Sequence, residues 1–160
     1  MSDDRIFADL KADHDRHRDL FERIASSDPD GDERARLFED LRVELQAHAA
    51  AEEESLYATM LGKPDLRDEA RHSVSEHKEI DDYLGELVEE DPSSDKWAKT
   101  FKDLRHRYLH HIDEEEEEMF PAASDDLDDA TKERLAETFE NRKPKEVERA
   151  EDELPGDARA

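Results

Sequence analysis

The feature that most constrains the fold of this chain is an ungapped internal repeat. Residues 38–58, FEDLRVELQAHAAAEEESLYA, align with residues 101–121, FKDLRHRYLHHIDEEEEEMFP, at an offset of 63. In both halves a lone histidine stands 34 residues before the histidine of a His-x-x-x-Glu motif. The matched polar pairs are His14 with His77, His48 with His111, and Glu52 with Glu115. A repeat of two helical hairpins predicts a pseudo-twofold bundle.

Apolar periodicity supports the same architecture. The breakers SSDPDGD, GKP and EDPSSD divide the chain into four segments, and each segment has the apolar spacing of an amphipathic helix. In the fourth segment, for example, Trp97, Phe101, Leu104 and Tyr108 recur three or four residues apart. Short connections between four such helices predict an all-α, up-down-up-down antiparallel four-helix bundle.

The C-terminal part of the sequence has a weaker pattern. An acidic start and a small apolar face predict a short fifth helix at about residues 128–142. The segment after Pro144 is rich in charge and has little to bury, which favours disorder. We therefore expect one bundle domain over residues 1–142 and a disordered acidic tail over residues 143–160.

Composition excludes several classes of function. Asp and Glu number 49 against 24 Lys and Arg, for a net charge of −25, which disfavours a nucleic acid or an anionic membrane as partner. The absence of cysteine excludes disulfides and thiolate metal sites. With no apolar run of membrane length and no apolar region near the start, the chain is expected to be cytoplasmic. Its acidity fits adaptation to a salty cytoplasm, although an acidic mesophilic protein could look the same.

The six repeated polar residues occupy helix positions where the period demands apolar side chains. A buried carboxylate without a compensating charge would cost several kcal/mol or be forced to protonate. Four imidazoles and two carboxylates at one level of a bundle instead predict a two-metal site, for which iron, manganese or zinc is suitable. One carboxylate from each half could bridge the metals, with two histidines as terminal ligands on each.

These motifs resemble the hemerythrin-like, or HHE cation-binding, domain family. The resemblance rests on the lone histidines in LKADHDRHRDLF and SEHKEI, and on HAAAE and HIDEE with their flanks EEESLY and EEEEEMFP, and it covers roughly residues 5–140. It implies a non-haem di-iron centre with an oxo or hydroxo bridge. The implied terminal ligands are His14, His48, His77 and His111, and the implied bridges are Glu52 and Glu115.

Two further residues are candidate ligands. Oxygen-carrying hemerythrins have a second histidine where this chain has Asp81. An extra anionic ligand at this position would favour oxidised irons, so this departure from the family pattern disfavours reversible oxygen carriage. Asp81 is either a ligand, an outer group or solvent-facing. His17 lies near the buried face of its helix, but the residue that matches it in the repeat is Ile80. A position at the edge of the core is therefore a simpler interpretation of His17 than a role as ligand. We expect His72, His106 and His110 at the surface, and aromatic packing for Tyr108.

The resemblance leaves three functions open. The first is a protein that binds or senses dioxygen, peroxide or nitric oxide at its irons. The second is an enzyme that decomposes peroxide, as a catalase does, or reduces nitric oxide, and the third is an iron storage or iron-sensing protein. A ferritin-like site would need two Glu-x-x-His motifs, and EARH at residues 69–72 has no partner. A metal-free interaction module would leave the repeated His and Glu positions unexplained. The sequence indicates no particular protein partner.

Overall fold

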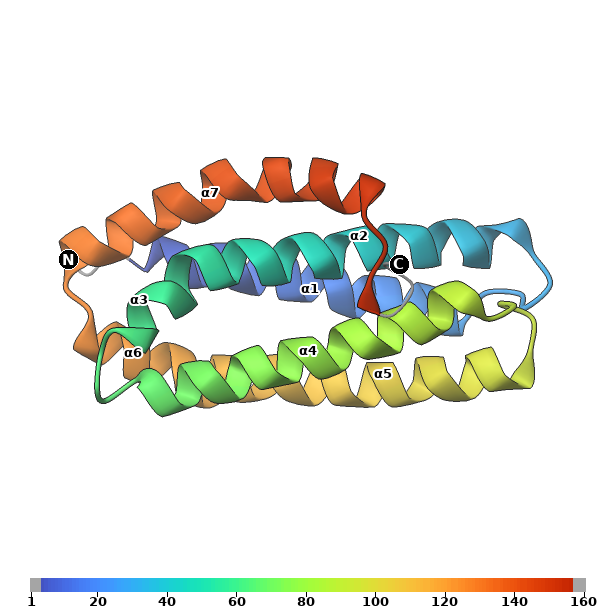
Figure 1. Cartoon of the computed structure of the whole chain (residues 1–160), viewed down its shortest axis with the longest axis horizontal. Coiled ribbons are helices and arrows are strands. Elements are labelled where there is room, and N and C mark those ends of the chain that lie inside the picture. The colour runs from blue at the N-terminus through green and yellow to red at the C-terminus, as the bar shows by residue number, and fades with distance from the viewer. Residues whose placement is uncertain (1–3, 157–160) are drawn as a thin grey trace.

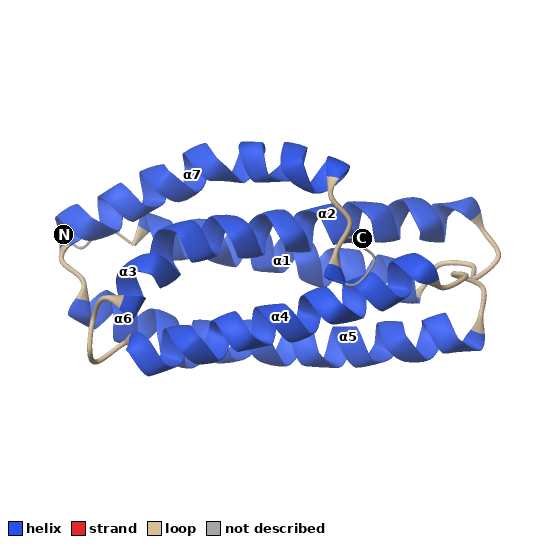
Figure 2. Ribbon diagram, in the orientation of Figure 1, coloured by secondary structure: helices blue, strands red, loops and turns tan. Residues whose placement is uncertain are grey.

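The computed structural model describes residues 4–156, and within that range the chain is helical with loops and no strand (Figure 2). Four long helices form the bundle: α1 (Arg5–Ala25), α2 (Asp32–Glu52), α4 (Arg67–Glu89) and α5 (Asp95–Glu114). The short elements η1 (Glu53–Tyr57) and α3 (Ala58–Leu61) follow α2, and η2 (Glu115–Met119) and α6 (Phe120–Asp126) follow α5. A further long helix, α7 (Asp129–Asp152), comes last. The predicted all-α bundle is confirmed.

The two hairpins of the repeat form the two halves of the bundle. Helices α1 and α2 pack together, α4 and α5 form the second pair, and α7 lies along α1 and α2 (Figure 1). The breakers act as predicted: α5 begins after Ser94, whose side chain accepts a hydrogen bond from the Trp97 amide. None of the helices in residues 4–156 has the length and apolar character needed to cross a membrane.

A π-helical turn begins at or directly after the glutamate of each His-x-x-x-Glu motif. Helix α2 ends at Glu52 and η1 begins at Glu53, while Glu115 is itself the first residue of η2. Such turns are rare and occur frequently at functional sites, because the extra residue changes the direction of the side chains around it. The sequence pattern did not predict them.

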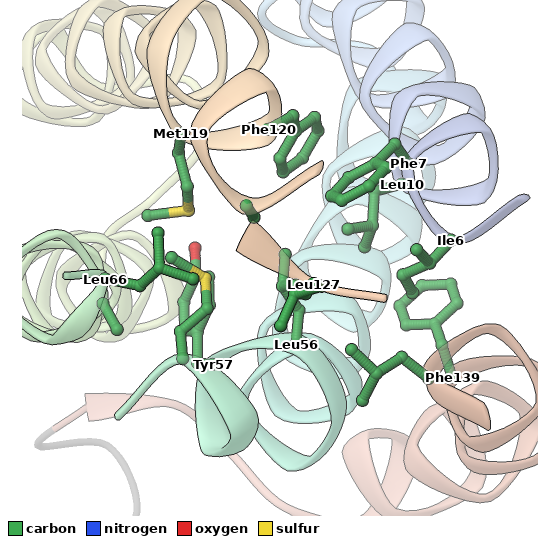
Figure 3. Close-up of a cluster of buried hydrophobic side chains, with 14 of the residues drawn as sticks. Ile6, Phe7, Leu10, Leu56, Tyr57, Leu66, Met119, Phe120, Leu127 and Phe139 are labelled. Carbon is green, nitrogen blue, oxygen red and sulfur yellow. The ribbon is translucent and has the colours of Figure 1, made fainter. Parts of the chain in front are cut away.

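Two apolar clusters pack the ends of the bundle, with a polar layer between them. Figure 3 shows the first cluster, in which Phe7, Leu56, Phe120 and Phe139 come from different helices. The second cluster lies at the other end and is built around the buried indole of Trp97. Along α1, Ile6, Phe7 and Leu10 belong to the first cluster and Leu20, Phe21 and Ile24 to the second. The residues between them, including His14, therefore lie in the middle layer, away from either open end.

The last helix is longer than the sequence indicated. Helix α7 continues through Pro144 to Asp152 rather than ending near residue 142, so residues 143–152 are helical instead of a disordered tail. Figure 1 shows α7 arching along the outside of α2. Its second half buries few apolar side chains, which is why hydrophobic periodicity missed it; polar contacts with α1 and α2 hold it instead. Residues 157–160 of the predicted tail lie outside the described residues.

The buried guanidinium of Arg42 anchors the end of α7. Only 2% of Arg42 is exposed, and its Nη1 donates to the carbonyl oxygens of Ala150 at 2.9 Å and Glu153 at 3.1 Å. The last carbonyls of a helix have no partner within the helix, so this side chain supplies one. The chain then crosses toward α4, where the Gly156 amide donates to Asp81 Oδ2 at 2.9 Å (Figure 1). Gly156 has a φ of +54° and approaches the α4 backbone too closely to carry a Cβ.

Replacing Arg42 by Met is expected to release the end of α7. The substitution keeps the apolar stem but removes hydrogen bonds from a charged donor, for a loss of about 2 kcal/mol in the free energy of unfolding. Urea denaturation measures the loss, and limited proteolysis after residue 143 should become faster. The exposed Arg36 on the same helix is the control: Arg36→Met should change neither quantity, and equal effects of the two substitutions would contradict the anchoring role.

Candidate metal centre

The structure brings the six repeated polar residues together in the middle layer. All six are buried, from 0% exposure for His14 and Glu52 to 8% for His77. They form two groups whose ligand atoms lie within 4.8 Å of one another: one of Glu52, His77, His111 and Glu115, and one of His14, His48 and Glu52. Convergence of these residues at one level, expected from the repeat, is therefore what the fold produces.

Each carboxylate lies between histidines from both halves of the repeat. Glu52 Oε1 is 3.6 Å from His48 Nε2 and 3.3 Å from His77 Nε2. Glu115 Oε1 is 3.0 Å from His111 Nε2 and 3.7 Å from His14 Nε2. A carboxylate in this position can contact two cations at once, one on the side of each histidine pair.

In each His-x-x-x-Glu motif, a carboxylate accepts a hydrogen bond from Nδ1 of the histidine, the ring nitrogen that faces away from the centre. His48 Nδ1 donates to Asp13 Oδ2 at 2.9 Å, and His111 Nδ1 donates to Glu76 Oε1 at 2.9 Å. Both acceptors are buried. A carboxylate on Nδ1 fixes the tautomer that leaves Nε2 free as an electron-pair donor, as is usual for histidines that bind metals.

The lone histidines have the same arrangement. His14 Nδ1 donates to Glu116 Oε2 at 2.7 Å, and His77 Nδ1 lies 3.4 Å from Glu53 Oε1. These four outer acids were missed by the sequence analysis, yet they obey the same offset of 63: Asp13 matches Glu76, and Glu53 matches Glu116. The presence of an acidic residue at the same position in both halves of the repeat was the sequence signal that could have identified them.

The inner atoms of the centre lack hydrogen-bond partners. The Nε2 atoms of His14, His48 and His111 make no hydrogen bond. Both carboxylate oxygens of Glu52 and Oε1 of Glu115 also lack a hydrogen-bond partner. Buried polar atoms are almost always satisfied, because leaving one unpaired costs about 1–3 kcal/mol. Nitrogen and oxygen atoms that converge without partners are suited to divalent or trivalent cations, so these residues fit a metal centre.

The electrostatics of the layer also favour a cation. Burial, reinforced by the nearby Glu115 carboxylate, raises the pKa of Glu52 well above its usual value. Burial lowers the pKa of His48 to about 3, which keeps that ring neutral and able to bind a cation. Burial also opposes the charge of His111, but Glu115 and Glu76 outweigh it and raise the pKa of His111 to about 9. The two buried carboxylates thus repel each other, and a bound cation would relieve that repulsion.

The two halves of the centre are not identical. Tyr57 stacks on His77 at 5.2 Å, and at the matching position Phe120 stacks on His14 at 5.9 Å. The Tyr57 hydroxyl donates to Glu115 Oε2 at 2.7 Å, whereas Phe120 has no hydroxyl to offer Glu52. One carboxylate is therefore oriented by a hydrogen bond, and the other keeps both oxygens free.

His17 is fully buried but faces other partners. Its Nδ1 accepts a hydrogen bond from Tyr108 at 2.6 Å, and its Nε2 donates to Glu44 at 3.0 Å. Both nitrogens are thus engaged outside the six-residue set. Lys143 of α7 completes the network by donating to Glu44 at 3.0 Å and to Asp13 at 2.8 Å. Tyr108, for which packing was expected, both packs and forms a hydrogen bond.

The remaining sequence candidates do not belong to the six-residue set. Asp81 is half-buried, accepts from the Gly156 amide, and belongs to none of the residue groups that could hold a metal in residues 4–156. His72, His106 and His110 are exposed, as predicted. The acidic runs are not wholly solvated, because Glu116 and Glu53 each direct a carboxylate toward a histidine of the centre.

A pocket of about 460 Å³ reaches the centre between α2, α4 and α7. His48, His77 and Tyr108 line its inner part, and Lys78 and Arg149 are among its charged lining residues. A small molecule can therefore approach the histidines from this side.

The fold and the site define a helical bundle protein of the cation-binding class. The chain matches the hemerythrin HHE cation binding domain over residues 5–123, and it belongs to that family. Among solved structures, it is similar to a hemerythrin HHE cation binding domain-containing protein from Mycobacterium kansasii, at 26% identity and a TM-score of 0.76, covering 88% of this chain and 85% of the other. A search of curated proteins finds no significant match.

Replacing Lys143 by Met is expected to destabilise the protein in a pH-dependent way. Burial alone would raise the pKa of Glu44, but His17 and Lys143 outweigh it and lower that pKa to about 2 from 4.5. Burial likewise opposes the charge of Asp13, but His48 and Lys143 outweigh it and lower the pKa of Asp13. Stability from a lowered carboxyl pKa is present above the unfolded value and is lost as pH falls through the folded value. The substitution should therefore cost about 1–2 kcal/mol at pH 7.

The difference between the variant and the original protein should shrink as pH falls from 4.5 toward 2. Urea unfolding at several pH values measures it. Lys145→Met, at an exposed position on the same helix, should leave stability unchanged at every pH. A loss for Lys143→Met that is independent of pH would mean that the lysine acts through packing alone.

Proposed function

We propose that this protein binds two iron ions in its middle layer, together with a small ligand such as dioxygen, peroxide or nitric oxide. The observation that carries the proposal is the position of Glu52 and Glu115, each between histidine nitrogens of both halves. Their free oxygens and the free Nε2 atoms form a set of nitrogen and oxygen donors without thiolate, which suits non-haem iron.

Bound iron would supply redox-active centres with open coordination positions, because six protein ligands cannot complete two octahedral shells. The chain's own residues would do the rest. His14, His48, His77 and His111 would hold the ions through Nε2, with Glu52 and Glu115 between them. The outer carboxylates would keep the rings in place, and the Tyr57 hydroxyl would orient Glu115.

The same pocket that reaches His48 and His77 supports binding of a small ligand. It has room for several water molecules, and the apolar clusters on either side would exclude bulk water from the centre. Exclusion of water strengthens every electrostatic interaction inside the site. This arrangement favours a binding or sensing role, in which the ligand enters and leaves through one opening.

The adjacent histidines of the fourth helix provide a matched test of the ligand set. His111→Ala should abolish stoichiometric binding of two irons, because it removes an inner nitrogen at the centre, whereas His110→Ala, at a side chain that is 63% exposed, should retain it. Both proteins would be reconstituted anaerobically with ferrous iron and assayed for iron content after desalting. Circular dichroism checks that each variant is folded. Full iron content in His111→Ala would reject the proposed ligands.

Peroxide decomposition is a second candidate, favoured by the pair of Tyr108 and His17. The Tyr108 hydroxyl donates to His17 Nδ1 at 2.6 Å, and the tyrosine also lines the pocket that leads to the centre. The Tyr108 hydroxyl, held by His17, could give a proton to a peroxide molecule in the pocket, and the tyrosine could regain that proton from water through the same opening.

If the protein is such an enzyme, Tyr108→Phe should lower peroxide turnover about 100-fold, the usual size of a lost proton transfer, at unchanged iron content. Oxygen evolution from hydrogen peroxide measures the rate. Tyr83→Phe is the control, because Tyr83 packs against the apolar cluster away from the pocket. A single stoichiometric reaction of the original protein, or a full rate in Tyr108→Phe, would leave binding or sensing as the function.

A further inference from the structure

A second pocket, of about 210 Å³, reaches the centre between α4 and the α5–η2 helix. Its lining includes His111 and Glu115 of the centre and the exposed His72, and it shares no lining residue with the larger pocket. The centre therefore has two separate openings, and their chemistry differs.

The smaller pocket is strongly acidic. Its lining carboxylates are Asp68, Glu69, Glu76, Glu114, Glu115 and Glu118, and no lysine or arginine lines it among the described residues. The larger pocket, in contrast, includes Lys78 and Arg149. Burial and the neighbouring Glu118 and Glu114 raise the pKa of Glu69, which reflects this crowding of like charge. A concave surface lined by one sign of charge concentrates ions of the opposite sign.

Three residues of this pocket are placed to hold a cation. Ligand atoms of His72, Glu76 and Glu114 lie within 4.8 Å of one another. His72 Nε2 is 3.4 Å from Glu76 Oε1 and 3.9 Å from Glu114 Oε1. One imidazole and two carboxylates suit ferrous iron, manganese or zinc.

Glu76 connects this cluster to the centre. Its Oε1 lies near His72 and also accepts from His111 Nδ1 at 2.9 Å, while its Oε2 faces Arg107 at 3.6 Å. Beyond it, Glu115 is 2% exposed and has an oxygen without a hydrogen bond, and His111 is 1% exposed and has a free Nε2. The pocket thus leads from a cluster at the surface to unpartnered donors in the core.

We propose that His72, Glu76 and Glu114 form an auxiliary cation site that captures ferrous ions from solvent and passes them to the centre through this pocket. The inference rests on the proposed iron-binding function. The acidic opening would admit the metal, and the larger pocket, with its mixed charge, would admit the small ligand. Iron could then be loaded without displacing a ligand from the other route.

Stopped-flow loading of the metal-free protein with ferrous iron under anaerobic conditions tests the inference. The double variant His72→Ala, Glu114→Gln keeps Glu76 and all six residues of the centre. It should load about ten-fold more slowly, because local attraction and capture of the cation are lost, and it should reach the same final iron content. His106→Ala, Glu117→Gln is the control: it removes the same groups from exposed positions outside the pocket and should load at the original rate.

The outcomes separate the two proposals. An equal loading rate in the double variant would overturn the auxiliary site while leaving the iron centre intact. A lower final iron content at an unchanged initial rate would overturn it as well, because the residues would then stabilise the centre rather than load it. If the original protein takes up no iron, the proposed function fails, and the loading route fails with it.

Discussion

Two carboxylates buried at the middle of a helical bundle are the constraint on which the rest of this structure depends. Glu52 and Glu115 are 0% and 2% exposed, and they have oxygen atoms that no hydrogen bond satisfies. Placing such groups in a core is costly unless a compensating charge is present. The surrounding histidines supply part of that charge, and bound cations would supply the remainder. The apolar clusters at both ends then pack the four helices around this layer.

The outer acids show how the layer is kept in order. Each histidine of the centre has an acid at its Nδ1, and the four acids follow the same repeat as the histidines they contact. The repeat therefore encodes an inner set and its supports together. Where the repeat breaks, the centre becomes asymmetric: Tyr57 is matched by Phe120, and His17 by Ile80. These differences place a hydroxyl near Glu115 and a polar network on one side only.

The acidity of the chain has a local as well as a global aspect. A net charge of −25 would by itself only repel nucleic acid and other acidic partners. In the folded protein, some of this charge lines a pocket beside His111 and Glu115, and some of it, in Asp13 and Glu44, pairs with Lys143 to hold α7. The second half of the last helix is thus attached by ion pairs and by Arg42 rather than by a broad apolar face.

The sequence by itself determined the helical bundle, its two-hairpin repeat and the convergence of His14, His48, Glu52, His77, His111 and Glu115, because periodicity and equal spacing place residues on one face at one level. Only the tertiary structure decided the rest. The length of α7 depended on contacts with side chains far away in sequence, such as Arg42, and the π-helical turns left no mark in the apolar pattern. The partners of His17 and Asp81 also come from other helices or from the end of the chain. A one-dimensional period reports which face a side chain occupies, whereas its partner depends on how separate elements meet in space.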